Sequence, residues 1–323
     1  MGIFKNRSRE ILLALVIIGI GFMITLISKS FFTLRNFSNI LDNNSILGIM
    51  SIGMMIIITT GNIDRSVGAQ FAVTGMITAA YVRATDGNNI FLTFIIAILS
   101  GLVLGLINGF FVSKLSIPAI VVTLGTWNIL RGTLYVVTNG NMIQNLSGPF
   151  TKLSVMRVGP LTIETYIWFF VMLFTYFILF RTRIGRDILA VGGNKTAAER
   201  IGINPSKIYF FAFGYMGILS GLASALSVSK IKMAAPTSGN GYEITLIAAT
   251  VIGGTAFAGG VSSVFGTFLG ILLIGMIYNG LVMMKVPVFW QDLLTGIIII
   301  AAVTSSALQT SGGIKKAKQL KTQ

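Results

Sequence analysis

The sequence predicts an all-α, polytopic membrane protein with about ten transmembrane helices. Three observations support this prediction: 54% of the 323 residues are hydrophobic, only 10% are charged, and the mean hydropathy is +0.85. Soluble domains carry about 25% charged residues, so this chain has too few charges to cover a surface that faces water. A membrane-spanning helix uses about 20 residues. Ten such helices leave room for loops and two short tails, but not for a separate soluble domain.

Long apolar runs give seven strong candidate spans and three weak ones. The strong candidates are 11–28, 40–60, 90–112, 161–180, 207–228, 262–284 and 288–308. The weak candidates are 66–82, 117–137 and 244–260. The sequence does not decide whether these three segments cross the membrane completely. The weak runs are short, rich in glycine or interrupted, as at Pro118. Irregular backbone at membrane depth is stable only inside protein or beside a cavity, so we expect the weak spans at the centre and the strong ones at the periphery.

The first apolar run follows three cations, Lys5, Arg7 and Arg9, as in a secretory signal peptide. No small-residue cleavage site follows this run and many further spans do, so we expect it to be retained as the first helix. Residues 1–323 then form a single transmembrane domain, with tails at 1–10 and 309–323 and one sizeable polar loop at 181–207.

Ten spans place both termini on the same side of the membrane. With cytoplasmic termini, the inner segments hold 15 Lys and Arg residues and the outer segments hold 8, while Arg131 lies inside a span. Because Lys and Arg accumulate in cytoplasmic loops, this distribution favours cytoplasmic termini. The net charge of +15 therefore follows the topology of the loops and does not indicate a nucleic-acid partner.

A short motif occurs twice, about half a chain apart. Asn108-Gly109 is followed five residues later by Lys114, and Asn279-Gly280 is followed five residues later by Lys285. In a ten-span topology the first copy ends the fourth span and the second ends the ninth, in opposite orientations. Two inverted five-helix repeats require this relation, although two glycine-rich apolar helices can also be similar by chance.

Several classes of chemistry lack the residues they need. Cys and His are both absent, which removes disulfides, thiolate nucleophiles, imidazole bases and the usual ligands of zinc, haem and iron–sulfur clusters. The string from Gly192 to Thr196 lacks the spacing of a phosphate-binding loop, and no apolar strand leads into it. We therefore expect no enzyme activity, no metal and no cofactor on this chain.

The loop 181–207 contains the signals of one short helix. Asn194 suits an N-cap, and 196–201 favours a helix. Gly202 suits the left-handed position after the helix, and Pro205 stops its continuation. One face carries side chains that let a partner's backbone approach closely: Ala197, Ala198 and Ile201. A helix of under two turns is not stable alone, so we expect it to dock against another surface.

Three dispersed stretches of the sequence resemble motifs of a known family. The first is Gly61-Asn62-Ile63-Asp64-Arg65-Ser66-Val67-Gly68. The second runs from Gly185-Arg186 through Gly192-Gly193-Asn194 to Ala197-Ala198 and Gly202-Ile203. The third is Gly241-Tyr242-Glu243 with Ile247-Ala248-Ala249, Gly253-Gly254-Thr255 and Gly259-Gly260. In this order they resemble the first signature, the coupling loop and the second signature of the ribose-type sugar ABC importer permeases. With Gly266-Thr267 and Asn279-Gly280, the resemblance covers about residues 40 to 305.

The first signature departs from the family pattern. Asn62 is inserted where the family usually has Gly next to Ile, and Arg65 replaces the usual Leu. A guanidinium at this position either changes the role of the signature or brings the segment close to the cytoplasmic surface.

The resemblance implies a permease subunit of a binding-protein-dependent importer in the bacterial inner membrane. Two permease subunits, either two copies of this chain or this chain with a similar one, form a path through the membrane lipid. Two cytoplasmic ATPase subunits, which bind ATP and Mg²⁺, drive transport. An extracytoplasmic binding protein delivers a small sugar or sugar-like solute.

The resemblance also implies a mechanism and its residues. The short helix would dock in a groove of the ATPase, and its movement would tilt the attached spans and open the path alternately to each side. The contact residues and hinges are then Gly185, Arg186, Gly192, Gly193, Asn194, Ala197, Ala198, Gly202 and Ile203.

Candidate residues of the translocation path are Asp64, Ser66, Asn108, Gly253, Gly254 and Asn279. Each has a second interpretation. Asp64 can pair with Arg65 or cap the helix that begins near Ser66. The glycines can serve helix packing, and the asparagines can form interhelical hydrogen bonds. Trp127 and Trp290 can stack on a sugar ring or anchor the protein at the membrane interface.

An ion-coupled secondary transporter of a small polar solute is the main alternative, since inverted repeats are common in that class. Proton coupling usually needs acids within the membrane, and the candidates are Asp64, Glu164, Glu243 and Asp292. All four lie near the ends of predicted spans, which argues against this alternative. A membrane enzyme is disfavoured by the absence of paired acids, and a channel by the absence of a filter motif.

Overall fold

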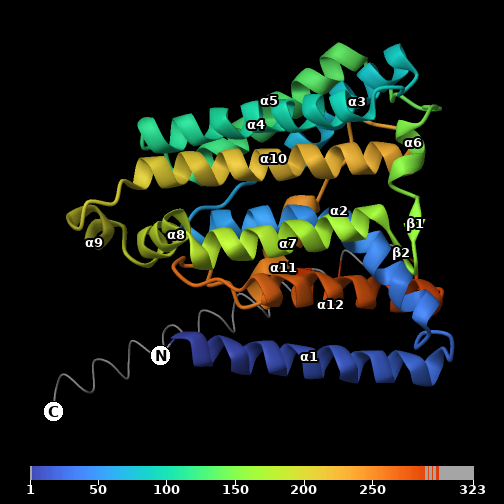
Figure 1. Cartoon of the computed structure of the whole chain (residues 1–323), viewed down its shortest axis with the longest axis horizontal. Helices are drawn as coiled ribbons and strands as arrows, with labels where there is room; N and C mark the ends of the chain where they lie inside the picture. The colour runs from blue at the N-terminus through green and yellow to red at the C-terminus, as the bar shows by residue number, and fades with distance from the viewer. Residues whose placement is uncertain (1, 288–289, 291–292, 294–295, 298–323) are drawn as a thin grey trace.

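The computed structural model of the chain is a bundle of helices, most of which run along its long axis (Figure 1). It describes residues 2–287, 290, 293 and 296–297. The helices are α1 (Gly2–Ile27), α2 (Leu34–Thr59), α3 (Val67–Thr85), α4 (Ile90–Lys114), α5 (Ala119–Thr138), α6 (Phe150–Leu153), α7 (Ile163–Arg181), α8 (Arg183–Gly193), α9 (Lys195–Arg200), α10 (Pro205–Ile231), α11 (Tyr242–Ile252) and α12 (Val264–Met283). A small antiparallel hairpin, β1 (Arg157–Val158) and β2 (Leu161–Thr162), leads into α7. The predicted helical, polytopic class is confirmed.

Seven helices of the described residues are long and apolar enough to cross a membrane. They are α2, α4, α5, α7, α10, α12 and the part of α1 from Glu10 to Ile27. They correspond to six of the seven strong predictions and to the weak prediction 117–137. The remaining strong prediction, 288–308, lies largely outside the described residues, and the tail 309–323 lies entirely outside them.

Two of the weakly predicted spans are not long apolar helices in the structure. The prediction 66–82 corresponds to α3, a helix of 19 residues that is not among the seven apolar spans. The prediction 244–260 is wrong as one continuous helix, because α11 has 11 residues and ends at Ile252. At this point Gly253 lies against Gly266 so closely that a Cβ on either residue would overlap the carbonyl oxygen of the other. The chain then turns through non-helical backbone before α12 begins.

The centre of the bundle is formed by α2 and α10, whose side chains are mostly buried. The expectation that strong spans lie at the periphery is therefore wrong for these two helices. The expectation that weak spans are central is wrong for α5, which exposes most of its side chains. Apolar character does not drive helices together in lipid, whereas small residues let backbones approach closely. Accordingly, a Cβ on Gly101 or Gly105 of α4 would overlap the backbone of α10 at Gly217 or Phe213.

The bundle has two distinct ends (Figure 1). The short helices α8 and α9 lie at one end, which we call the coupling end, while α6 and the β1–β2 hairpin lie at the other, which we call the hairpin end. At the hairpin end, Asp42 of α2 accepts hydrogen bonds from the Thr162 amide at 3.0 Å and from the Thr165 hydroxyl at 2.7 Å. Asp42 also forms an ion pair with Arg157 at 2.9 Å. These contacts fix the hairpin and the start of α7 to the central helix α2.

Candidate functional site

The predicted short helix is present at the coupling end. It is α9, and the Asn194 side chain caps it by accepting a hydrogen bond from the Ala197 amide at 2.9 Å. Gly202 has a φ of +84°, in the left-handed region expected after the helix. Pro205 is the first residue of α10, where its fixed φ favours the start of a helix.

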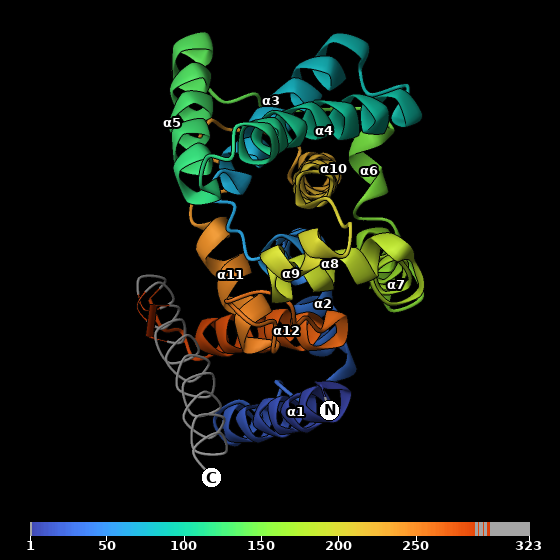
Figure 2. The same cartoon turned by 90° about the vertical axis from the view of Figure 1, so that its left-hand side faces the viewer.

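A second helix, α8, precedes α9 and was not expected from the sequence. The Thr182 hydroxyl caps it by accepting a hydrogen bond from the Gly185 amide at 3.3 Å. Its buried face consists of Gly185, Ile188 and Val191. Gly185 is required by the sharp turn out of α7, because a Cβ there would overlap the carbonyl oxygen of Leu179. The coupling end is therefore a pair of helices that packs onto the bundle through α8 (Figure 2).

Three separate backbone segments meet where α8 ends. A Cβ on Gly192 would overlap the carbonyl oxygen of Thr59, the last residue of α2, and the same oxygen accepts a hydrogen bond from the Gly260 amide at 2.9 Å. Gly259 and Gly260 have φ values of +90° and +76° and lie against Gly192 and Gly193. We call this contact of Thr59, Gly192, Gly193, Gly259 and Gly260 the glycine junction. It connects α8 to the end of α2 and to the segment between α11 and α12.

The candidate coupling residues differ in their accessibility. Arg186, Gly193, Asn194, Ala197 and Gly202 are exposed, Gly192 and Ile203 are partly buried, and Gly185 and Ala198 are buried. Ala198 is only 2% exposed, whereas Ile201 is 74% exposed. The expectation that Ala198 shares an open face with Ala197 and Ile201 is therefore wrong, because Ala198 packs on the protein's own core.

Asp64 is the centre of a buried polar cluster. Its carboxylate accepts hydrogen bonds from the Ser66 amide at 2.8 Å, from the Ser66 hydroxyl at 2.6 Å and from Gln70 at 3.2 Å. The Asn108 side chain donates to the Ser66 hydroxyl at 2.8 Å and accepts from Thr126 at 2.7 Å. Asp64 thus closes the turn that leads into α3 through the amide of Ser66, the N-cap residue, and is neither the cap itself nor the partner of Arg65. Asn108 joins the start of α3 to α4 and α5.

Arg65 pairs with Glu243 rather than with Asp64. The ion pair joins the segment before α3 to the first turn of α11, and the guanidinium lies 5.2 Å from the centroid of the Trp127 ring. Because Arg65 lies over Trp127, this ring is already occupied by a cation. Arg131 of α5 donates hydrogen bonds to the carbonyl oxygens of Pro236, Gly68 and Ser238. Sequence reasoning missed this cluster, because nothing local to Arg65 indicates its partner.

The remaining path candidates form packing contacts. Gly253 packs on Gly266, and Gly254 has a φ of +93° in the turn that follows α11. The side chains of Asn279 and Asn36 donate to each other at 3.1 and 2.9 Å, which joins α12 to α2. For these residues the structure agrees with the packing and interhelical interpretations.

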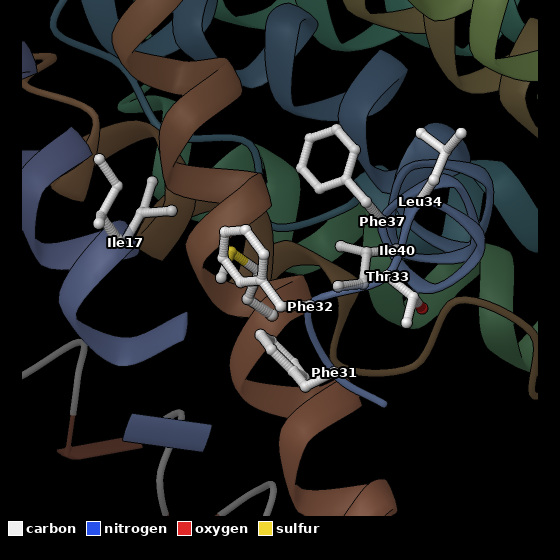
Figure 3. Close-up of a pocket in the computed structure, with 9 residues that line it drawn as sticks. Ile17, Phe31, Phe32, Thr33, Leu34, Phe37 and Ile40 are labelled. Carbon is white, nitrogen blue, oxygen red and sulfur yellow. The ribbon is translucent and has the colours of Figure 1, made fainter. Parts of the chain in front are cut away.

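A cavity of about 390 Å³ lies between α1, the start of α2 and α12 (Figure 3). Its lining is almost entirely apolar, and Figure 3 labels Ile17, Phe31, Phe32, Thr33, Leu34, Phe37 and Ile40. The one hydroxyl, that of Thr33, already accepts from the Asn36 amide at 3.2 Å and donates to the Ser30 carbonyl oxygen at 3.0 Å. A polyhydroxylated solute would find no free polar partner among these residues, so this cavity is not a sugar site.

Comparisons with known proteins agree with the fold and the motifs. Residues 36–303 match a family described as the permease component of branched-chain amino acid transport systems. The chain belongs to this permease family. It is 35% identical over 304 residues to the ribose import permease protein of Escherichia coli K12, covering 92% of each chain. The ribose import permease protein of Haemophilus influenzae is 35% identical over 307 residues, with 94% of each chain covered.

A relative with a different named solute is also similar. The autoinducer 2 import system permease protein of Yersinia pseudotuberculosis is 31% identical over 301 residues, covering 93% of this chain and 85% of the relative. No solved structure matches the chain. The protein is therefore a transmembrane permease subunit of an ABC importer, as its motifs indicate.

Proposed function

We propose that this permease moves a small sugar or sugar-like solute into the cytoplasm, and that two cytoplasmic ATPase subunits drive it with ATP and Mg²⁺. An extracytoplasmic binding protein delivers the solute, and a second permease, identical or similar, completes the path. The solute class rests on the relatives, which are named for ribose and autoinducer 2 import. The aligned lengths support this proposal, because the alignment covers nearly the whole of this chain and of the ribose permeases.

The observation that carries the proposed coupling is the glycine junction. The helices α8 and α9 occupy the coupling end, and the end of α8 touches α2 and the α11–α12 segment at backbone contact distance. A force applied to α8 and α9 by an ATPase would therefore reach both segments at once, because close-packed backbones cannot absorb the displacement. The exposed contacts for the ATPase are Arg186, Gly193, Asn194, Ala197 and Gly202.

We also propose that the chain contains ten spans in two inverted repeats, with cytoplasmic termini. The glycines beside the repeated Asn-Gly motif support this relation. Gly105 of α4 packs on α10, while Gly275 of α12 packs on Asn44 of α2. The two copies thus lie on helices that each pack against one of the two central helices, as repeats related by an inversion would.

We propose that the translocation path lies beside the start of α3. Asp64 and Ser66 precede this helix, and Asn108 of α4 contacts Ser66. All three are fully buried in this conformation, so they would reach a solute only after α3 or α5 moves. We assign Gly253, Gly254 and Asn279 to packing around the path instead.

Co-purification tests this proposal. The chain is tagged in its native membrane and purified in mild detergent, and a stoichiometric nucleotide-binding subunit is expected to accompany it. Gly193→Arg and Ala197→Arg place a bulky cation on exposed positions of the coupling end and are expected to remove that subunit. Asn141→Arg adds the same side chain at an exposed position between α5 and α6 and is expected to keep it. Recovery of the permease alone, without any ATPase, would overturn the proposal.

A further inference from the structure

A polar cavity of about 250 Å³ lies behind α9, between this helix and the connection from α4 to α5. Seven polar side chains of the bundle and of α9 line it: Asn62, Ser113, Ser116, Lys195, Glu199, Ser206 and Tyr209. Pockets for drug-sized ligands have volumes of about 300 to 1,000 Å³, so this cavity admits only a small solute. Its two residues on α9, Lys195 and Glu199, are not among the residues of the proposed ATPase contact.

The lining offers both donors and acceptors of hydrogen bonds. The Ser113 side chain is 5% exposed, and its hydroxyl has no hydrogen-bond partner among the described residues. The Ser206 hydroxyl donates to the Ser113 carbonyl oxygen at 2.8 Å, and the Asn62 side chain donates to the Thr60 hydroxyl at 3.0 Å. A buried hydroxyl without a partner is unfavourable, and a polar molecule bound at this wall would supply one.

The charges of the lining balance. Lys195 and Glu199 both line the cavity from α9, and neither is in an ion pair within the part of the chain that the structure describes. A cation and an acid on the same wall favour an uncharged ligand, because an anion would meet Glu199 and a cation would meet Lys195. Hydroxyl groups on the ligand can accept a hydrogen bond from Lys195 and donate one to Glu199.

We propose that this cavity binds a small, uncharged, polyhydroxylated solute and that the bound solute holds α9 against the α4–α5 connection. The inference rests on the proposed function in one respect: cytoplasmic access requires that the coupling end face the cytoplasm. A ligand that contacts both walls stabilises the conformation in which the walls are close. Imported solute that accumulates in the cytoplasm then opposes the movement of α9 and slows further import, because coupling between two sites is reciprocal.

The absence of cysteine in the chain permits a direct binding test on the isolated permease. A single cysteine is introduced by Ser116→Cys, which places a thiol in the lining, and its alkylation by N-ethylmaleimide is timed with and without D-ribose. At ten times the dissociation constant, D-ribose is expected to slow alkylation by about tenfold. Asn141→Cys, an exposed position away from the cavity, is the matched control and is expected to react at the same rate in both conditions. Ribitol is expected to protect and D-ribose 5-phosphate is not, because the latter is an anion.

Variants that alter the cavity identify it as the binding site. Ser113→Leu fills the cavity and is expected to remove the protection, and Ser206→Val is the second variant should Ser113→Leu fail to fold. In the reconstituted transporter, D-ribose on the ATPase side is expected to slow ATP hydrolysis, and this slowing is lost in the same variants. Two results would overturn the inference. One is alkylation of Ser116→Cys at the same rate with and without saturating D-ribose. The other is slowing of alkylation by D-ribose that persists when Ser113→Leu or Ser206→Val is also present. The alkylation test needs no ATPase, so its result is independent of the co-purification result.

Discussion

Arg65 forms an ion pair with Glu243, and this pair joins the first signature of the permease family to the second. The partner of the arginine is almost fully buried, at 2% side-chain exposure. Trp127 covers the guanidinium from α5, and Arg131 on the same helix holds the carbonyl oxygens of the segment before α11. Two cations of the first half of the chain therefore hold the start of α11 in place.

This relationship predicts a specific pattern of stability. Arg65→Leu leaves Glu243 buried without its cation and is expected to lower the free energy of unfolding by about 3 kcal/mol. The double variant Arg65→Leu/Glu243→Gln removes both charges and is expected to recover most of that loss. Urea unfolding in mild detergent measures both effects. The single variant Glu243→Gln completes the cycle. A loss in the double variant equal to the sum of the losses in the two single variants would show that the ion pair does not couple the two segments.

The glycine junction predicts different results for two neighbouring residues. Gly192→Ala places a Cβ onto the carbonyl oxygen of Thr59 and is expected to cost about 1–3 kcal/mol through overpacking. Gly193→Ala is the matched control, because its Cβ would lie 3.9 Å from Gly260, an ordinary contact. We expect the first variant to bind the ATPase but to transport poorly, and the second to resemble the wild type. Equal transport by both variants would contradict the role of the junction.

Local signals made part of this site predictable. Asn194, Gly202 and Pro205 mark the bounds of α9 through capping, a left-handed residue and a fixed φ, which depend only on neighbouring residues. The helix α8 was missed because its stability comes from burying Ile188 and Val191 against the bundle, which the sequence of the loop does not show. The burial of Ala198 was missed for the same reason.

Distant pairings were equally inaccessible from the sequence. Arg65 and Glu243 both stand out in the sequence, but their contact depends on how α3 and α11 pack. The glycines at 253 and 254 were visible, yet only the contact with Gly266 shows that α11 ends there. The central positions of α2 and α10 follow from glycine packing rather than from hydropathy, so a ranking of spans by apolar character could not place them.

The Asp64 cluster predicts how the permease differs from a proton-coupled transporter. Asp64→Asn keeps one oxygen for the Ser66 amide and is expected to retain solute uptake within a few-fold of wild type, because no proton needs to bind there. Asp64→Ala removes the acceptor of the Ser66 amide and hydroxyl and is expected to lower stability by about 1–3 kcal/mol. Uptake assays and urea unfolding distinguish the two effects. Complete loss of uptake in a stable Asp64→Asn protein would contradict this prediction.

The reciprocal contact between Asn36 and Asn279 predicts a modest structural role. Asn279→Ala is expected to lower stability by about 0.6 kcal/mol, a typical value for an interhelical hydrogen bond in a membrane. The solute concentration that gives half-maximal uptake is expected to stay unchanged. A change in this concentration without a change in stability would show that Asn279 contacts the solute in the translocation path.

ATP-dependent uptake in proteoliposomes distinguishes an ABC permease from an ion-coupled transporter. The permease is reconstituted with its co-purified ATPase, and radiolabelled D-ribose is supplied with a matching binding protein on the side opposite the coupling end. We expect uptake that requires ATP on the coupling side, is lost in Gly193→Arg and is retained in Asn141→Arg. Uptake that proceeds without ATP and follows an imposed proton or sodium gradient would contradict this expectation.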